Sequence, residues 1–302
     1  MSDIPFIKDF NFEYGACERL SPLVRRVIAN NPGPYTYSGS GTYMVGSIEG
    51  PIVIIDPGPA LSDHCDAVVA TVGRAKVDAI LVTHTHLDHC GGARELSEAL
   101  NTPVHAFGAH PVADARDDAP ALDEGGDYRF RPDHHIANGD TYSGPGWTLT
   151  AVHTPGHLSN HLCFALQEEK ALFTGDHIMG WATTVVAPPD GDMAAYIESL
   201  ELLLSRDDEI YYPTHGAPIK NPQAFTRAVR AHRFFRDGQI VEQLKSGRET
   251  IGEIVPVMYA SVDKRLHPAA ALNVYAHLIR LVTNGNVTCD GAPTMTSRYI
   301  AI

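Results

Sequence analysis

Six residues of the sequence, HTHLDH at positions 84–89, concentrate side chains that bind metal ions. His84 and His86 alternate, so in an extended segment both project to the same side and can bind one ion. Asp88 and His89 follow one turn later and point elsewhere, toward a second ion. Imidazole and carboxylate ligands suit zinc, and iron and manganese accept the same ligand types. One motif supplies too few ligands for two ions, so the sequence predicts that the others come from distant segments.

Three further candidate ligands each follow a run of residues that is typical of a β-strand. A single histidine or aspartate in a loop is usually only solvated, but three in the same position relative to a strand support one another. Asp56 ends the run 51–56 in the same way, and the HTHLDH motif follows the run 78–83. We therefore expect one edge of a sheet to gather all five loops. The three candidates are His157 after 147–153, Asp176 after 171–174 and His215 after 209–212.

The remaining elements of this part alternate between strands and helices, which is typical of an α/β fold. Ser62 is expected to cap the first helix. Gly91 and Gly92 are expected to let the backbone turn from the motif into the next helix. Residues 111–135 are rich in Pro, Asp and Gly, which favours a surface loop bordering the site, with a lid as one role. The expected helices are 62–74, 91–100 and 192–205, and two further strands are 103–107 and 162–166.

The sequence becomes helical from residue 223 onward and ends in a hairpin-like stretch, 287–300. Three helices followed by a hairpin is the pattern of a winged-helix module. Charge divides at the same place: residues 1–223 carry 13 Lys and Arg against 30 Asp and Glu, whereas residues 224–302 carry 10 against 6. The acidic part weighs against a broad nucleic-acid footprint. We expect a catalytic domain over 1–220 and a winged-helix-like domain over 221–302.

Length and composition describe an ordinary globular protein of 302 residues, 44% hydrophobic and 20% charged. No stretch approaches the roughly 20 apolar residues of a membrane span. The start, MSDIPFIKDF, lacks the features of a secretory signal. The five cysteines are scattered without a CxxC pair, which fits a reducing compartment. These features predict a cytoplasmic protein with no membrane partner.

The ordered series HxHxDH, GH, GD and a late His resembles the metallo-β-lactamase-fold hydrolases over about residues 35–220. The resemblance implies a four-layer αββα sandwich with the metal site along one edge of two paired sheets. Asp56 matches an early aspartate of the family that supports the ligands by hydrogen bonds. By the family pattern, the first metal is bound by His84, His86 and His157, the second by Asp88, His89 and His215, and Asp176 bridges the two.

The C-terminal part, including AHRFFRDGQIVEQL at 231–244, is similar to the β-lactamase-like subgroup that includes a mitochondrial endoribonuclease. This second resemblance covers about residues 221–300 and contains no catalytic motif. It favours single-stranded RNA as a substrate, and the positive charge of this part agrees weakly.

The expected chemistry is metal-dependent hydrolysis with two Zn²⁺ per chain. Zinc lowers the pKa of bound water to about 7, so a metal-bridging hydroxide is the predicted nucleophile and Asp88 the residue that orients it. An ester-type, thioester or phosphodiester bond suits this chemistry, and the fold does not choose among them. Alternatives are a glyoxalase-II-type thioesterase or another small acyl hydrolase, with β-lactamase activity on the side. A non-enzymatic binding module with a structural metal is the remote alternative.

Overall fold

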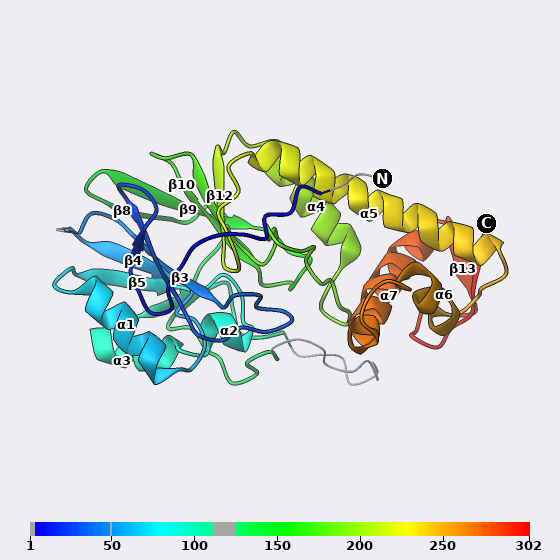
Figure 1. Ribbon diagram of the computed structural model, residues 1–302, viewed down its shortest axis with the longest axis horizontal. Helices are drawn as coiled ribbons and strands as arrows, with labels where there is room; N and C mark the ends of the chain where they lie inside the picture. The colour runs from blue at the N-terminus through cyan, green and yellow to red at the C-terminus, as the bar shows by residue number, and fades with distance from the viewer. Residues whose placement is uncertain (1–3, 49, 112–124) are drawn as a thin grey trace.

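The computed structural model describes residues 4–48, 50–111 and 125–302. Two β-sheets pack face to face, and helices cover both outer faces (Figure 1). The strand order is β1-β2-β3-β4-β5-β6-β7 in the first sheet and β12-β11-β10-β9-β8 in the second. The α/β class and the four-layer αββα sandwich predicted from the sequence are therefore confirmed.

The strands of the first sheet are short, and most are buried on both faces. They are β1 (Glu18–Arg19), β2 (Val24–Ile28), β3 (Gly41–Val45), β4 (Ile52–Ile55), β5 (Val77–Leu81), β6 (Val104–Ala106) and β7 (His134–His135). β4, β5, β6 and β7 run parallel to one another, so the loops after β4 and β5 leave the sheet at the same edge. β7 falls within the loop expected over 111–135, of which residues 112–124 lie outside the described part.

The second sheet presents its strand ends to that same edge. Its strands are β8 (Thr141–Gly144), β9 (Trp147–His153), β10 (Leu162–Leu166), β11 (Ala171–Gly175) and β12 (Ile210–Pro213). The two sheets bury an apolar layer that includes Trp147, Phe164 and Phe173, each at most 2% exposed. Burial of such side chains stabilises the fold by roughly 1.5–3 kcal/mol each. This layer fixes the sheets against each other and so fixes the relative positions of their loops.

Helices complete the outer layers. α1 (Ser62–Val72) and α3 (Ala93–Leu100) pack on the first sheet, and α4 (Met193–Leu204) packs on the second. The expected capping role of Ser62 is wrong: Leu61 occupies the N-cap position, Ser62 is already helical, and no side chain caps this helix. Asp192 does cap α4, because its carboxylate accepts hydrogen bonds from two backbone N–H groups of the first turn.

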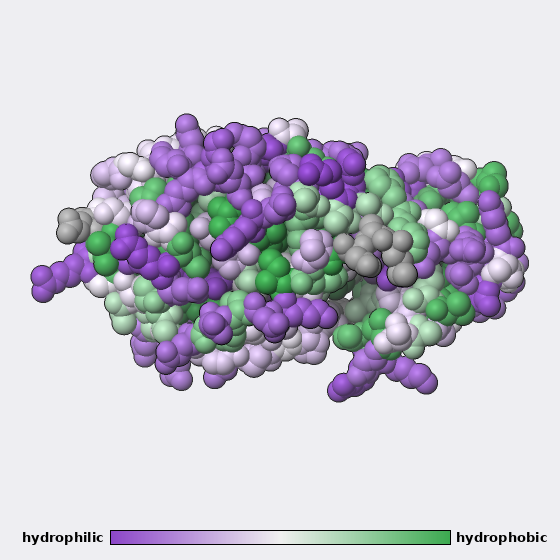
Figure 2. Space-filling model, turned by 45° about the horizontal axis from the view of Figure 1, so that its top comes forward, coloured by the Kyte–Doolittle hydropathy of each residue, from purple (hydrophilic) through white to green (hydrophobic). Residues whose placement is uncertain are grey.

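The C-terminal part has a hydrophobic core of its own, built around Ile254, Leu278 and Tyr299. Its expected three helices and hairpin are confirmed, because β13 and β14 pair antiparallel. Figure 2 shows the molecule hollowed between this part and the larger one, with hydrophobic side chains beside the hollow. The elements are α5 (Pro222–Lys245), α6 (Ile251–Met258), η1 (Lys264–Leu266), α7 (His267–Thr283), β13 (Val287–Cys289) and β14 (Tyr299–Ala301).

Helix α5 belongs to both parts (Figure 1). Phe225 and Val229, near its start, pack into the core of the second sheet and α4. Ile240 and Leu244, near its end, pack into the C-terminal core. A single helix thus holds the C-terminal part in place beside the sandwich. Within the described residues, no helix is both long enough and apolar enough to cross a membrane.

Candidate metal centre

Loops from both sheets meet at one edge and bring the seven predicted ligands together. The motif HTHLDH follows β5, and its second half forms the short helix α2 (Leu87–Cys90). The backbone N–H of Leu162, at the start of β10, donates to the carbonyl of Thr83 over 2.7 Å and ties the sheets together directly beside the motif. The other loops follow β9, β11 and β12, and they carry His157, Asp176 and His215.

Three histidines form the first group. Nδ1 of His86 lies 3.0 Å from Nε2 of His84 and 3.1 Å from Nε2 of His157. Nδ1 of His157 donates to the carbonyl of Val185 over 2.7 Å, which leaves Nε2 of the neutral ring without a hydrogen. All three side chains are buried. The group therefore offers three ring nitrogens that converge on one point.

The second group combines carboxylates and histidines. Oδ2 of Asp88 lies 3.1 Å from Nε2 of His215 and 3.4 Å from Nε2 of His89. Oδ1 of Asp176 lies 3.3 Å and 3.4 Å from the same two nitrogens. Oδ2 of Asp176 points the other way and lies 3.9 Å from Nε2 of His157 in the first group. Asp176 thus stands between the two groups, one oxygen facing each.

The cluster leaves buried polar atoms without partners. Nε2 of His89 and Oδ1 of Asp176 have no hydrogen bond although neither is reached by solvent. Such groups are rare because an unsatisfied buried polar atom costs about 1–3 kcal/mol. Within the described residues, three sets of ligand atoms each lie within 4.8 Å of one another, the distance a shared metal ion needs. The donor set therefore fits divalent metal ions.

The charge states also fit metal ligands. Burial, with help from the neighbouring histidines, holds the pKa of His84 well below its usual value, so its ring is neutral. Burial would raise the pKa of Asp88, but His89 and His215 lower it to about 2, so the carboxylate is ionised. Burial would lower the pKa of His215, but Asp176 and Asp88 raise it to about 10. Neutral imidazoles and ionised carboxylates bind metals, and the raised pKa marks a place that favours positive charge.

Asp56 holds this cluster from behind. Its Oδ2 accepts from Nδ1 of His89 over 2.8 Å and from the hydroxyls of Thr83 and Thr214 over 2.9 Å each. Its Oδ1 accepts from the backbone N–H of Thr83 over 2.8 Å. The bond to His89 fixes the tautomer that turns Nε2 toward Asp88 and Asp176. The carboxylate thereby ties the loops after β4, β5 and β12 to one another.

Several supporting contacts are absent from the sequence analysis. The hydroxyl of Thr184 donates to the carbonyl of Asp176 over 2.6 Å. The fully buried Arg233 of α5 donates to the carbonyl of Thr184 over 2.7 Å. Nε2 of His161 accepts from the backbone N–H of Asp176 over 3.2 Å. These contacts join residues far apart in the chain, and no local pattern signals them.

The expected role of the paired glycines is wrong for Gly92. Its backbone is ordinary right-handed, so no left-handed turn requires glycine there. A Cβ at Gly92 would instead lie 3.1 Å from the carbonyl oxygens of both Pro57 and Pro59. The N–H of Gly92 donates to the carbonyl of Gly58 over 2.9 Å. Glycine is therefore needed for the close approach of the loop that follows Asp56.

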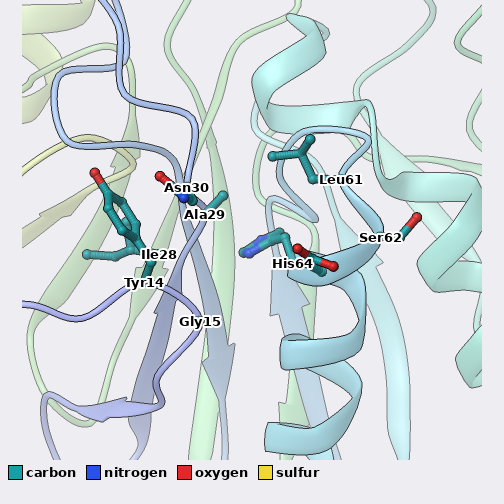
Figure 3. A pocket seen from close by; sticks show the side chains of 9 residues that line it. Tyr14, Gly15, Ile28, Ala29, Asn30, Leu61, Ser62 and His64 are labelled. Atoms are coloured by element: carbon teal, nitrogen blue, oxygen red, sulfur yellow. The ribbon is translucent and has the colours of Figure 1, made fainter.

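A pocket much larger than the hollow at the candidate metal centre lies elsewhere in the molecule. A pocket of about 520 Å³ lies between α1 and the end of β2, and the ring of His64 reaches from α1 toward Ala29 and Asn30 (Figure 3). None of the described residues in the potential metal-binding groups lines it. The hollow lined by His86, Asp88 and their neighbours measures only about 30 Å³, room for one or two water-sized species. Chemistry therefore places the candidate site in the smaller hollow.

A family model decides the relationship to known proteins. Residues 38–215 match the model of the metallo-beta-lactamase superfamily. The chain belongs to the metallo-beta-lactamase superfamily. Residues 250–294 match the beta-lactamase associated winged helix domain, which confirms the resemblance expected for the tail. Members of the superfamily are hydrolases, so this protein is a hydrolase of that superfamily.

Curated relatives in this superfamily cover most of the chain. An atrochrysone carboxyl ACP thioesterase from Aspergillus chevalieri is 35% identical over 261 residues, which are 82% of this chain and 76% of the relative. A beta-lactamase-like protein 2 homolog from Drosophila melanogaster is 32% identical and covers 90% of this chain and 92% of its own. A beta-lactamase domain protein from Burkholderia ambifaria has the same fold, with a TM-score of 0.77, 20% identity and coverage of 97% and 96%.

Proposed function

We propose that this protein is a two-metal hydrolase that cleaves an acyl thioester. One observation carries the metal-dependent part: ring nitrogens and carboxylate oxygens of buried residues converge without enough hydrogen-bond partners to satisfy them. The choice of a thioester rests on relatives such as the 35% identical Aspergillus thioesterase. The hollow at the cluster measures about 30 Å³, which suits a small uncharged acyl carbonyl better than a bulky nucleotide.

Each ligand has a proposed role. Two Zn²⁺ ions would supply Lewis acidity toward the scissile carbonyl and lower the pKa of a bound water to about 7. Asp88 is the proposed catalytic residue: its ionised carboxylate would orient the attacking water through Oδ1, which leaves Oδ2, the oxygen that faces His89 and His215, as the metal ligand. Ser40 Oγ, 3.2 Å from that oxygen, holds the carboxylate in place. The proposed ligands are His84, His86 and His157 for one ion, Asp88, His89 and His215 for the other, and Asp176 for both.

Single-stranded RNA is the second candidate substrate, because residues 224–302 carry 10 Lys and Arg against 6 Asp and Glu. Much of that charge is not available to a phosphate backbone. Arg233 is fully buried, and four other arginines are paired with carboxylates within the chain. The thioester is therefore the preferred proposal. The paired arginines are Arg230 with Glu201, Arg265 with Asp263, Arg280 with Asp237 and Arg298 with Glu249.

We also propose residues 1–220 as the catalytic domain and 221–302 as the winged-helix-like domain. The separate core around Ile254 and Leu278 supports two units. The proposed boundary falls directly before α5, whose first turns pack on the larger unit. The cytoplasmic location remains a prediction from the sequence.

The test compares substrates on purified, zinc-loaded protein. An octanoyl thioester, a short single-stranded RNA, a lactone and a chromogenic β-lactam are offered side by side. We expect the thioester to give the highest kcat/KM, a chelator to abolish turnover, and metal analysis to find two ions per chain. RNA cleavage without thioester hydrolysis would overturn the substrate. One inert zinc per chain with no turnover would instead support the metal-stabilised binding module.

A further inference from the structure

A second pocket, which we call the acyl pocket, lies between the larger part of the molecule and the C-terminal helices. Its volume is about 440 Å³, within the roughly 300–1,000 Å³ typical of small-molecule sites. Four segments build it: the N-terminal stretch around Phe6, the loop at Pro34 and Tyr35, the loop from Met179 to Val185, and the C-terminal helices. The hollow between the two parts in Figure 2 is bordered by similarly hydrophobic side chains. Neither part of the chain forms this pocket alone.

The acyl pocket adjoins the hollow lined by His86 and Asp88, which we call the metal hollow. Tyr35, Met179 and Val185 line both. The carbonyl of Val185 also accepts from Nδ1 of His157, so a wall of the pocket touches a proposed metal ligand. No residue after His215 lines the metal hollow, whereas α5 and α7 line the acyl pocket. The proposed scissile bond would therefore lie at one end and the C-terminal helices at the other.

The walls of the acyl pocket are mainly apolar, and Arg236 is the charged group that α5 contributes to them. Arg236 stacks over the ring of Tyr259 at 4.9 Å, and within the described residues it forms no ion pair with a carboxylate. Its hydrogen-bond partners are neutral: it donates to Oε1 of Gln239 over 2.8 Å and to Nε2 of His232 over 3.4 Å. Burial lowers the pKa of His232 to about 4, so this ring is neutral as well. A cation without a carboxylate partner favours a ligand that carries anionic oxygen atoms.

Charge narrows the ligand further. Among the residues that the structure describes, no aspartate or glutamate lines the acyl pocket, although the whole chain carries a formal net charge of −13. Lys8 at the rim and Arg236 at the C-terminal end are its charged groups. An arginine binds a carboxylate through charge-assisted hydrogen bonds that are stronger than neutral ones. The pocket thus matches an apolar chain whose far end is anionic.

We propose that the acyl pocket binds the acyl group of the substrate, a mainly apolar chain with a carboxylate at the end remote from the scissile bond. Arg236 pairs with that carboxylate. The C-terminal helices are then a specificity element of the active site. This proposal rests on the proposed thioester hydrolysis, so its test includes a measurement that needs no turnover.

The kinetic test uses N-acetylcysteamine thioesters of acetate, octanoate and octanedioate, in which the thiol carries no anion. For the wild type, kcat/KM is expected to rise from acetyl to octanoyl to octanedioyl. Arg236→Gln should lower the octanedioyl-to-acetyl ratio at least about tenfold. Leu266→Trp, which fills the pocket from its rim, should lower the ratios of both eight-carbon substrates to acetyl. Matched controls outside the pocket, the exposed Arg227→Gln and Leu202→Trp, should leave every ratio as in the wild type.

The binding test measures the affinity of octanedioate by calorimetry. Both pocket variants should weaken binding at least about tenfold, and both controls should not. If the wild type hydrolyses no thioester but the variants change octanedioate binding as expected, the proposed function is overturned and the pocket is supported. If the wild type hydrolyses thioesters but Arg236→Gln and Leu266→Trp keep its substrate ratios and its affinity for octanedioate, only the pocket proposal is overturned. Arg236 is only half-buried, so its variant tests the proposal even if Leu266→Trp fails to fold.

Discussion

Buried histidine and aspartate side chains meet in two places in this chain, and the two clusters differ in how their charge is balanced. In the metal cluster, the group of proposed ligands around Asp88 and Asp176, the ion-pair partners of both carboxylates among the described residues are histidines. In the α5–α7 cluster, Asp237 accepts from Nδ1 of His277 over 2.8 Å and pairs with Arg280 over 2.5 Å. The second cluster supplies its own permanent cation, whereas the first does not. A carboxylate without such a cation is where a metal ion is expected.

The histidine pKa values show the same difference. The pKa of His277 is lowered, because burial outweighs the effect of Asp237. The pKa of His215 is raised to about 10, because Asp176 and Asp88 outweigh burial. Positive charge is thus favoured in the metal cluster and disfavoured at His277. Identical residue types form the proposed metal site in one place and join two helices in the other.

The largest predicted effect is on catalysis in the metal cluster. Asp88→Asn keeps the shape of the side chain but removes the charge that orients the attacking water. We expect kcat/KM to fall by about 10²–10⁴-fold. The variant should stay folded with a moderately lower melting temperature, because it loses the charge that His89 and His215 favour. Steady-state kinetics and thermal unfolding of the same preparation measure both, and a folded variant with full activity would contradict the assignment.

The matching substitution in the α5–α7 cluster should have the opposite signature. Asp237→Ala leaves Arg280 and His277 without their carboxylate partner, and breaking a buried pair costs about 3–5 kcal/mol. We expect the free energy of unfolding, measured in urea, to drop by that amount, while the folded fraction keeps the wild-type ratios among substrates. An Asp237→Ala variant that is stable but inactive would show that the α5–α7 cluster supports activity rather than stability.

The sequence predicts what local patterns encode. The strands β9 and β10 begin and end at the predicted residues, because apolar runs bounded by turn residues mark both ends. All the predicted ligands lie together, since each follows a strand that ends at the same edge. The absent cap of α1 was not predictable, because Leu61 holds the N-cap position without any capping side chain.

Contacts between distant segments escape such patterns. Arg233 and Thr184 are 49 residues apart, and no periodicity relates them. His277 and its partner Asp237 are likewise 40 residues apart. Gly92 is read from sequence as a turn residue, but its reason is the approach of Pro57 and Pro59 from another loop. Pairings of this kind depend on how the sheets and helices pack.

His64 is a buried histidine that lies in neither cluster and has no charged partner among the described residues, so it shows the effect of burial by itself. Burial alone lowers its pKa to about 4, against about 6.5 in the unfolded chain. Between pH 6.5 and 4 the unfolded chain binds a proton that the folded chain does not, so stability falls as pH falls through this window. His64→Gln, which can still bond to Thr42, should remove up to about 3 kcal/mol of that loss.

The measurement is the difference in unfolding free energy between pH 7 and pH 4.5, for wild type and His64→Gln. Other histidines contribute equally to both proteins, so the difference isolates His64. Parallel pH dependences would mean that its ring is protonated in the folded protein.

The smallest predicted effect tests whether the two clusters communicate through α5. Arg233 is fully buried and has no carboxylate partner among the described residues, so by itself it does not stabilise the fold. Its guanidinium donates to the carbonyl of Thr184, whose hydroxyl donates to the backbone carbonyl of Asp176. We expect Arg233→Met to keep or raise the unfolding free energy while kcat falls about tenfold and metal affinity weakens by 10–100-fold, the usual effect of losing a ligand's support. KM should change little, because Arg233 does not line the acyl pocket.

The control is Arg233→Lys, which retains a donor and should recover part of the metal affinity. If both variants lose metal affinity equally and are also less stable, Arg233 serves only packing.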